Sequence, residues 1–381
     1  MTKVLVIGGG IAGYCAALAA RREGAEVTVV ARAPGASALY AGGMEVVDDL
    51  DAILAQERHH PITRLGLDSV RLASELDVAI HTLQIALEKD GVKFEGTWRT
   101  LGLYSDIHGL ARPANLVPST VFGGELRALS GRRVAVVGVK QVGDYDAVST
   151  AQALKELHNV DAVPEEVSIP DLPIAASLTD LYGRRAPQLS HNRSTAVAYP
   201  PGFTNLPQGG FELLSAPPSP HGWRLQQAIS LGTITAHVTS FETSAGRIVS
   251  ARAGDRTFRA DTFILATGLH IGGGLNGGRV TSEPLLNLGV FHQGQPVRSS
   301  GTRLQHLQYL DPAEELRSGL MTDKGLHPLD EEGDAPYANL FAAGAVLGGY
   351  EYAGPCGFGV PMLTGWLAGT WAAKANRAAS R

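Results

Sequence analysis

The stretch that decides the fold is the aliphatic run Val4-Leu5-Val6-Ile7 and the glycine-rich turn directly after it, Gly8-Gly9-Gly10-Ile11-Ala12-Gly13. The run predicts a strand that is buried on both faces, and the turn has the spacing G-x-G-x-x-G. Gly8 permits a sharp turn, Gly10 lets the backbone approach a phosphate closely, and Gly13 lets the next helix lie against the strand.

The following residues complete this unit. Ala12 to Ala20 predict a helix that Gly24 ends, and Glu26 to Val30 predict the next strand. The free N–H groups at the start of such a helix attract an anion, so the unit predicts a nucleotide-type cofactor. A carboxylate that usually ends the second strand and holds an adenosine ribose is replaced by Ala31 and then Arg32. Since Arg32 can pair with a phosphate but cannot accept a hydroxyl proton, the identity of the cofactor stays open.

Composition narrows the class of protein. A chain of 381 residues predicts about two domains, and its net charge of −5 gives no reason to expect nucleic acid as a partner. The two cysteines, Cys15 and Cys356, do not form a disulfide framework and fit a reducing cytosol. The first strand begins almost at the N-terminus, which leaves no room for a signal peptide, and apolar runs are too short to span a membrane. We therefore expect membrane contact only through a partner or a surface patch.

Two later stretches predict further strands of the same kind of sheet as the first unit. Asp261 to Gly268 predict a buried strand that ends in Ala-Thr-Gly, after strands at Thr233 to Thr243, Ile248 to Ala253 and Arg256 to Arg259. Asn339 to Ala345 predict a last strand with Gly344 at its end. This stretch resembles the final strand of flavoproteins with two dinucleotide-binding units, in which an aspartate usually stands where this chain has Ala345. Gly357 to Met362 then begin a helix from Pro361 to Ala375, whose positive end would stabilise negative charge on a reduced flavin.

A second strand, turn and helix imitate the first imperfectly. Val134 to Val137 predict a buried strand, Gly138 to Gly143 a turn, and Ala147 to Leu157 a helix. The middle glycine is missing, which favours a structural unit of a substrate domain over a second dinucleotide site. Asp144 and Asp146 are interpreted as capping residues of this helix.

Several segments between these units can be interpreted in more than one way. Ala33 to Met44, with Gly42 and Gly43, predict a loop that either contacts a ring system through its backbone or is a surface turn. His59-His60 before Pro61 favours a turn over a metal or acid–base site. Asp48 to Gln56 predict a short helix. Apolar residues from Gly66 to Gly91 recur at helical spacing and predict a long amphipathic helix, whose Arg71, Glu75 and Lys89 are interpreted as a solvated face. Arg112 to Phe122 are interpreted as an irregular connection.

Taken together, these motifs resemble the flavin-dependent oxidoreductases with a discontinuous cofactor domain, and more narrowly the B subunits of anaerobic glycerol-3-phosphate dehydrogenases. The likeness covers nearly the whole chain. The residues that carry it are Ile7 to Gly13, Val30 to Arg32, Arg133 to Gly138, Leu214 to Pro218, Glu283 to Leu285, Leu340 to Gly349 and Cys356 to Gly359.

The resemblance implies an α/β fold with a Rossmann-like, glutathione-reductase-type flavin-binding domain, a small β-meander and an inserted α+β substrate or cap domain. We expect residues 1–60, 221–280 and 335–381 in the flavin domain and residues 61–220 with 281–334 in the cap. The family implies oxidation of sn-glycerol 3-phosphate to dihydroxyacetone phosphate, with electrons passed to the quinone pool in anaerobic respiration. It implies a catalytic FAD subunit and an iron–sulfur membrane-anchor subunit as partners, and a cytoplasmic chain bound peripherally to the membrane through them.

The B subunits of this family are associated with FMN, with FAD as the alternative, and the lack of a ribose carboxylate at Ala31 agrees with FMN. The candidate catalytic residues are Cys356, before the glycines that would face the flavin, and His270, just past Ala-Thr-Gly. The candidate cofactor-binding residues are Gly8, Gly9, Gly10, Ile11, Ala12, Gly13, Arg32, Gly42, Gly43, Thr267, Gly268, Gly344, Ala345, Gly357 and Gly359, and no metal ligands are expected.

Two other functions remain open at this point. One is a free-standing flavin oxidoreductase of a small amine or hydroxy acid, and the other is a cofactor-poor scaffold subunit, consistent with Ala31 and Ala345. Recognition of a substrate phosphate would need arginines, for which Arg184, Arg185, Arg193 and Arg224 are the candidates.

Overall fold

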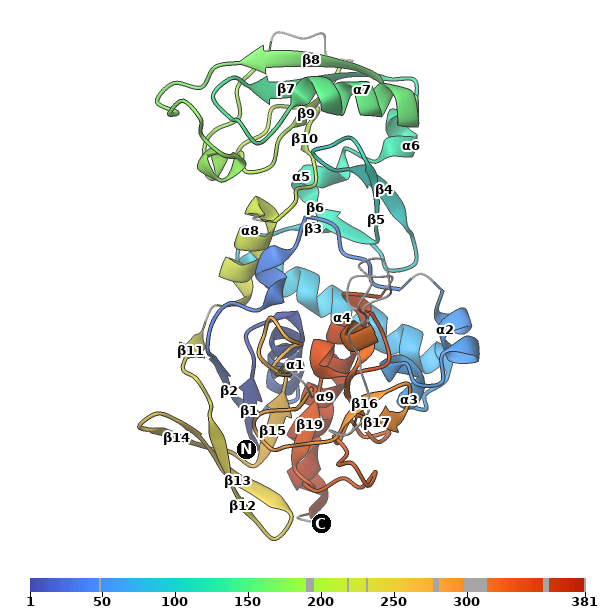
Figure 1. Cartoon of the computed structure of the whole chain (residues 1–381), viewed down its shortest axis with the longest axis vertical. Helices are drawn as coiled ribbons and strands as arrows, with labels where there is room; N and C mark the ends of the chain where they lie inside the picture. The colour runs from blue at the N-terminus through green and yellow to red at the C-terminus, as the bar shows by residue number, and fades with distance from the viewer. Residues whose placement is uncertain are drawn as a thin grey trace. The chain divides into compact units, whose positions relative to one another are not determined.

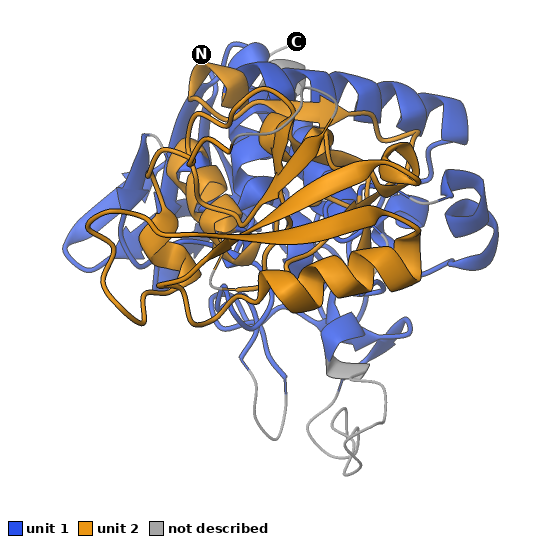
Figure 2. Cartoon of the chain, turned by 90° about the horizontal axis from the view of Figure 1, so that it is seen from above, with its two compact units in different colours: residues 1–37, 46–86, 229–381 blue, residues 38–45, 87–228 orange. Residues whose placement is uncertain are grey.

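A computed structural model describes residues 1–47, 49–189, 195–217, 219–230, 232–276, 281–297, 314–351 and 356–379. The chain forms two compact units (Figure 2). Unit 1 comprises residues 1–37, 46–86 and 229–381, and unit 2 comprises residues 38–45 and 87–228.

A parallel five-stranded sheet forms the centre of unit 1, in the order β11-β2-β1-β15-β19 (Figure 1). Every neighbouring pair is parallel, with Val4 of β1 opposite both Val27 of β2 and Thr262 of β15. The strands are β1 (Lys3–Ile7), β2 (Glu26–Ala31), β11 (Thr233–Thr235), β15 (Thr262–Leu265) and β19 (Leu340–Ala342). Parallel strands bring all their carboxyl ends to one edge, and the glycine turn, Ala-Thr-Gly and Gly344 each follow such an end.

Helices and a meander cover opposite faces of this sheet. Successive strand residues face opposite sides, so Thr262 and Phe263 mark the two faces of β15. The Thr262 hydroxyl donates to the carbonyl of Ala372 in α9 (Gly359–Ala379), whereas the Phe263 ring packs edge-on against Phe241 of the meander. The meander consists of β12 (Ser240–Ser244), β13 (Arg247–Ala253) and β14 (Arg256–Arg259). The predicted Rossmann-like sheet with a small β-meander is confirmed.

Small residues let α1 (Ile11–Arg22) and α9 pack with their backbones close together. A Cβ atom added at Gly365 or Gly369 would lie 2.4 Å from the carbonyl oxygen of Ala12 or 2.1 Å from that of Ala16. The two helices therefore pack along most of the length of α1, which fixes the start of α1 relative to the start of α9.

Unit 2 contains a second parallel sheet, in the order β10-β9-β7-β8. Its strands are β7 (Arg133–Val139), β8 (Asp161–Val167), β9 (Ala196–Tyr199) and β10 (Gly210–Glu212), and α7 (Ala147–His158) connects β7 to β8. The predicted second strand, turn and helix are confirmed as a βαβ unit. Two antiparallel pairs complete the sheets of unit 2, β3 (Phe94–Gly96) with β6 (Leu116–Pro118) and β4 (Gly102–Ser105) with β5 (Ala111–Ala114).

Two element predictions are wrong. Residues 112–122, expected to be irregular, form parts of β5 and β6 and the short helix α5 (Ser119–Phe122). The single strand expected over 233–243 is two strands, because β11 pairs with β2 in the parallel sheet while β12 pairs with β13 in the meander. The helix expected from Asp48 begins at Leu50, and Asp48 lies outside the described residues.

Further helices and short strands complete the two units. They are η1 (Ala36–Leu39), α2 (Leu50–Gln56), α3 (Pro61–Arg64), α4 (Ser69–Lys89), α6 (Leu126–Leu129), η2 (Leu178–Leu181), α8 (Pro220–Ile229), β16 (Val290–His292), β17 (Gln295–Pro296), η3 (Glu314–Arg317), β18 (Gly319–Leu320) and η4 (Gly344–Val346).

The two units divide the chain differently from the expected domains. Residues 61–86 and 281–334 fall in unit 1 rather than in a cap, while residues 38–45 and 221–228 fall in unit 2. One reason is α4, which was expected to expose Glu75 to solvent. The Glu75 carboxylate instead accepts a hydrogen bond from the Trp366 indole of α9 at 3.2 Å, which ties α4 to unit 1.

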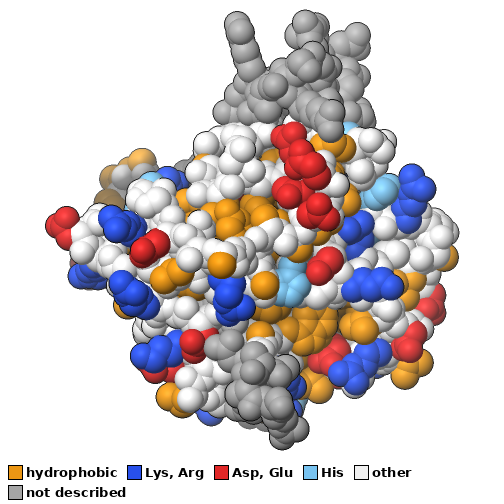
Figure 3. All heavy atoms as spheres, turned by 90° about the horizontal axis from the view of Figure 1, so that it is seen from below, with side chains coloured by type: hydrophobic (Ala, Val, Ile, Leu, Met, Phe, Trp, Pro, Cys, Tyr) orange, Lys and Arg blue, Asp and Glu red, His pale blue; other side chains and the backbone are white. Residues whose placement is uncertain are grey.

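Figure 3 shows one face of the molecule in space-filling form. Lys and Arg side chains are spread around this face, some acidic side chains form one group while others lie apart from it, and apolar side chains form small patches between them. On the described part of this face there is no continuous basic stripe of the kind that follows a nucleic-acid backbone.

Candidate functional site

The glycine turn has the close contacts that its spacing predicts. Gly8 has φ +131°, and a Cβ atom there would lie 1.9 Å from the carbonyl oxygen of Ala266 on the neighbouring strand. A Cβ atom at Gly13 would lie 2.1 Å from the carbonyl oxygen of Gly8. Both positions therefore require glycine because backbone packs directly on backbone.

Gly10 differs from Gly8 and Gly13 because no backbone atom in the described part of the chain lies close to the position of its missing Cβ atom. Among the described residues, a Cβ atom there would contact only the Ser37 hydroxyl, at an ordinary 3.5 Å. On the side where a Cβ atom would lie, Gly10 thus faces open space at the start of α1, while Gly35 packs against its backbone. The first-turn N–H groups of Ala12 and Gly13 have no acceptor within the helix. Ser37 occupies one side of this space, because its hydroxyl accepts the Ile11 N–H at 3.0 Å. A phosphate group would find N–H donors, a hydroxyl and the positive end of α1 here.

The end of β15 lies beside the glycine turn. After Ala266-Thr267-Gly268 the chain turns back on itself, with the Gly273 N–H donating to His270 and the Gly274 N–H to Leu269. The Thr267 hydroxyl and His270 Nδ1 are buried, and neither has a hydrogen-bond partner among the described residues. Buried polar atoms of this kind are normally satisfied, so both are positions that a bound polar group could complete.

Arg32 extends from the end of β2 toward the same turn. The Arg32 side chain is exposed, and a Cβ atom added at Gly273 would lie 3.4 Å from its guanidinium. A Cβ atom added at Gly9 would lie 2.9 Å from that of Ala31, the residue before Arg32. The structure thus brings Gly8 to Gly13, Arg32, Thr267, Gly268 and His270 together at one edge of the sheet.

Gly344, which follows β19, closes this edge from the other side. It has φ +81°, and a Cβ atom there would lie 2.5 Å from that of Ala12. The Gly344 N–H donates to the Thr364 hydroxyl of α9 at 3.0 Å. The half-buried Ala345 packs against a small apolar cluster formed by Leu269, Leu275, Val290 and Val297. Ala345 therefore provides an apolar contact where a carboxylate would bind cofactor hydroxyls.

Cys356 and the glycines after it lie at the start of α9. Cys356 is buried and has φ +76°, and a Cβ atom at Gly359 would lie 1.7 Å from the carbonyl oxygen of Val46. Gly357 between them is half-buried. Cys356 and His270 have different neighbours: Cys356 interacts electrostatically with Tyr350, whereas His270 belongs to the turn after β15. The other cysteine, Cys15, is buried in α1, and burial raises the pKa of its thiol to about 12, which makes it unreactive.

The two glycines expected in a flavin-contacting loop belong to unit 2. Gly42 has φ +118°, and a Cβ atom there would lie 2.7 Å from the His221 ring, while one at Gly43 would lie 2.9 Å from Ala114. Both positions are closely packed and neither is a free surface turn. The prediction that they contact a cofactor ring stays a prediction.

A buried charged cluster lies beside Gly42 in unit 2. Glu212 accepts from Arg224 at 2.6 Å and from the Gly202 N–H at 2.8 Å. Burial works against ionisation of Glu212, but its neighbours His221 and Arg224 outweigh burial, so the pKa of Glu212 lies below its ordinary value. Burial lowers the pKa of His221 while its neighbour Glu212 works in the opposite direction, and the His221 Nε2 donates to the Leu213 carbonyl.

Three of the four candidate arginines for binding a substrate phosphate lie among the described residues. Arg224 is paired with Glu212 and is therefore committed to a structural contact. Arg184 donates to the Asp180 carbonyl, and Arg185 forms a backbone bridge to Thr204. Arg193 lies outside the described residues.

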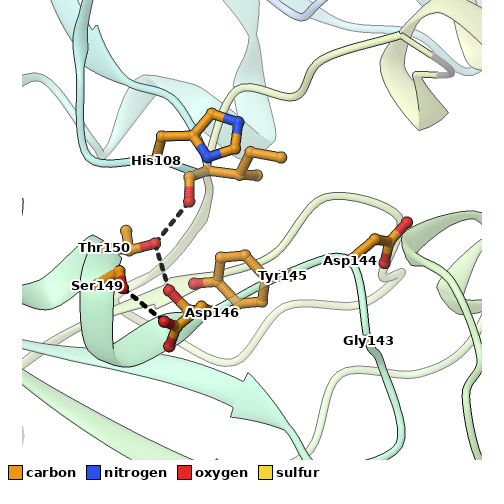
Figure 4. A pocket seen from close by; sticks show the side chains of 8 residues that line it. His108, Gly143, Asp144, Tyr145, Asp146, Ser149 and Thr150 are labelled. Atoms are coloured by element: carbon orange, nitrogen blue, oxygen red, sulfur yellow. Dashed lines mark hydrogen bonds between the residues drawn. The ribbon is translucent and has the colours of Figure 1, made fainter.

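A cavity of about 320 Å³ lies at the start of α7 in unit 2 (Figure 4). Its lining includes His108, the turn residues Gly143 to Asp146, Ser149 and Thr150. Asp146 caps α7 by accepting the Val148 N–H and the Ser149 hydroxyl, and Asp144 accepts the Leu178 N–H. The predicted capping role of Asp146 is confirmed, whereas that of Asp144 is wrong because its carboxylate binds the Leu178 N–H instead of α7. The start of α7 is thus occupied by a carboxylate, while the described residues place none at the start of α1.

Sequence reasoning missed three residues of the candidate site. Ser37 was treated as part of a featureless loop, although a serine shortly after a dinucleotide unit is able to cap its helix. Thr364 lies on α9 and binds the Gly344 N–H, a contact that no spacing rule predicts. Tyr350 is buried, and its hydroxyl has no hydrogen-bond partner among the described residues.

Comparisons with known proteins identify related chains. Residues 3–148 match the family model described as FAD binding domain. A protein of Halobacterium salinarum, named as the probable B subunit of anaerobic glycerol-3-phosphate dehydrogenase, is 28% identical, with 98% of each chain covered. The protein of Yersinia pseudotuberculosis named as the B subunit of the same enzyme is 26% identical, with 95% of each chain covered. Among solved structures, 3-ketosteroid delta1-dehydrogenase from Sterolibacterium denitrificans covers all of both chains at 12% identity and a TM-score of 0.45.

Among the helices of the described residues, none is long and apolar enough to cross a membrane. The glycine turn, the open space at Gly10 and the unsatisfied atoms of Thr267 and His270 fit a flavin nucleotide. The chain is similar, over nearly its full length, to the proteins named as B subunits of anaerobic glycerol-3-phosphate dehydrogenase, and its residues 3–148 match an FAD binding domain.

Proposed function

We propose that this chain is the flavin-binding subunit of a membrane-associated complex that oxidises sn-glycerol 3-phosphate to dihydroxyacetone phosphate and passes electrons to quinone. The observation that carries the proposal is the open space at Gly10, between the start of α1 and Ser37, in a chain related over its full length to named B subunits. The proposed partners are a catalytic FAD subunit and an iron–sulfur subunit that anchors the complex to the inner face of the cell membrane.

A bound flavin supplies the hydride and electron chemistry, so the protein has to bind, orient and shield it. In this proposal the N–H groups of α1 and the Ser37 hydroxyl hold a phosphate, and Arg32 adds a positive charge at the same edge. His270 is proposed to accept a proton through Nδ1, which is buried and has no partner among the described residues. Cys356 is proposed to contact the flavin from the start of α9.

The bound flavin is either FMN or FAD. The missing carboxylates at Ala31 and Ala345 favour FMN, which has one phosphate and no adenosine. The complete glycine turn is suited to a pyrophosphate, which FAD has and FMN lacks, and the matching family model is an FAD-binding one. Releasing the chromophore from the purified chain and identifying it by mass decides between FMN and FAD.

Gly10→Ala tests the site itself. The new methyl group would make only an ordinary contact with Ser37, so the apoprotein should keep the wild-type melting temperature. The same methyl group would occupy the space proposed for the phosphate, so flavin affinity should fall at least tenfold, measured by titrating apoprotein with FAD and FMN. Wild-type affinity in this variant contradicts the proposed phosphate site.

A second candidate is a cofactor-poor scaffold subunit of the same complex. The apolar packing of Ala345 against the cluster of Leu269, Leu275, Val290 and Val297 supports it, because an aspartate is expected at this position in a flavin-binding chain. Under this alternative the purified chain is colourless, takes up neither FAD nor FMN, and still co-purifies with an iron–sulfur partner. Uptake of one flavin per chain rules it out.

A further inference from the structure

Tyr350 stands out among the buried polar groups of unit 1. The side chain is only 5% exposed, and its hydroxyl has no hydrogen-bond partner among the described residues. Leaving a buried hydroxyl unsatisfied costs free energy, and native proteins normally give such a group a partner. The Tyr350 hydroxyl is therefore a position that a bound group would complete.

The segment that leads to Tyr350 starts at the edge of the sheet where the glycine turn lies. Tyr350 follows β19, shortly after Gly344, which packs on Ala12 in the first turn of α1. Gly349, the residue before it, packs against the backbone of His59, where a Cβ atom would lie 2.1 Å from the carbonyl oxygen. Ligands of parallel α/β sheets bind outside the carboxyl ends of the strands, and the segment that leads to Tyr350 starts at one of those ends.

A strained residue lies beside this hydroxyl. Cys356 has φ +76°, which is unfavourable for a residue with a side chain, and it interacts electrostatically with Tyr350. The His60 ring packs edge-on against the Tyr350 ring, with 5.8 Å between the ring centres. Backbone strain that the surrounding structure maintains tends to occur at functional sites, and here it coincides with an unsatisfied hydroxyl.

The charge state of this cluster indicates what it would bind. Burial raises the pKa of Tyr350, so its hydroxyl stays protonated and is a neutral donor. Burial lowers the pKa of His60 to about 4, so its ring is neutral near pH 7. A neutral donor among neutral groups suits a carbonyl oxygen or a ring nitrogen better than a phosphate, whose charge is matched instead at α1 and Arg32.

We propose that the Tyr350 hydroxyl donates a hydrogen bond to the ring system of the bound flavin, with His60 and Cys356 fixing the position of the tyrosine. This inference rests on the proposed function, because it requires that the chain binds a flavin. It adds a ring-binding residue to a site whose other proposed contacts, at the glycine turn, Ser37 and Arg32, are with phosphate.

Tyr350→Phe tests the inference because it removes only the hydroxyl. The apoprotein should melt at or above the wild-type temperature, since an unsatisfied buried group is lost. Flavin affinity should fall about three- to tenfold, the effect of losing one neutral hydrogen bond, and the visible absorption bands of the bound flavin should shift.

Tyr145→Phe is the matched control. Its hydroxyl is also buried, lies next to Thr150 without hydrogen-bond geometry, and belongs to unit 2. This variant should leave both flavin affinity and the flavin spectrum unchanged. If wild type and Tyr145→Phe bind flavin and Tyr350→Phe matches them in affinity and spectrum, the inference about Tyr350 is overturned while the proposed function stands. If wild type takes up neither FAD nor FMN, the proposed function is overturned first.

Discussion

Gly13 lies so close to Gly8 that a Cβ atom at Gly13 would be 2.1 Å from the Gly8 carbonyl oxygen. This contact sets the distance between α1 and β1 and therefore the position of the N–H groups proposed to bind phosphate. Gly143, at the matching place of the second strand, turn and helix, would place a Cβ atom in space that the described residues leave open. The same motif position is thus a packing requirement in unit 1 and not in unit 2.

Gly13→Ala should therefore destabilise the protein by about 1–3 kcal/mol, because overlap with backbone outweighs the roughly 1 kcal/mol that alanine gains over glycine in a helix. Gly143→Ala should leave stability within about 0.5 kcal/mol of wild type. Urea denaturation midpoints of the two variants measure the difference. Equal midpoints would mean that α1 can move away from β1 without cost.

The parts of the fold that follow from local spacing were predictable. Gly8 and Gly13 specify the turn because each is required by a close contact with backbone, either within the turn or beside the adjacent strand. The strand that leads to Ala266 was predictable because its apolar run is continuous. In unit 2, Asp146 was identified as a cap from its position before Ala147 alone.

Features that depend on distant contacts were not predictable. Glu75 was assigned to solvent because its helical face is polar, and only the fold brings the Trp366 indole to it. Ser37 and Tyr350 carry no spacing signal, since each acquires its role from an element far away in the sequence. The sequence resemblance identified the family, but the division into units depended on which helices pack on α1 and α9.

Arg32→Ala tests the charge at the end of β2. Arg32 is exposed, so a contact with a phosphate should contribute less than about 1 kcal/mol, and flavin affinity should fall no more than about fivefold. The loss should shrink as salt is raised, because exposed charges are screened. Arg256→Ala, which removes an exposed arginine from the meander, is the control and should leave affinity unchanged. Titrations at two salt concentrations measure both effects, and a loss independent of salt would speak against a charge contact.

His60 should lower the free energy of unfolding as the pH falls below 6.5. Burial lowers the pKa of His60 from 6.5 to about 4. An unfolded chain therefore takes up this proton at a higher pH than the folded chain, so the contribution is fully present above pH 6.5 and is lost as pH falls toward 4. The difference of about 2.5 pKa units corresponds to roughly 3 kcal/mol at most.

His60→Asn should flatten this dependence. The His60 ring accepts the Ile62 N–H through Nδ1 at the start of α3, and an asparagine oxygen can accept the same bond. The variant should be less stable than wild type at pH 7.5, since it loses the ring packing on Tyr350, but it should lose less stability between pH 6.5 and pH 4.5. His81→Gln, which replaces an exposed histidine of α4, should keep the wild-type dependence. Melting temperatures across this range measure the slopes, and parallel curves for wild type and His60→Asn would show that the buried ring does not control the acid sensitivity.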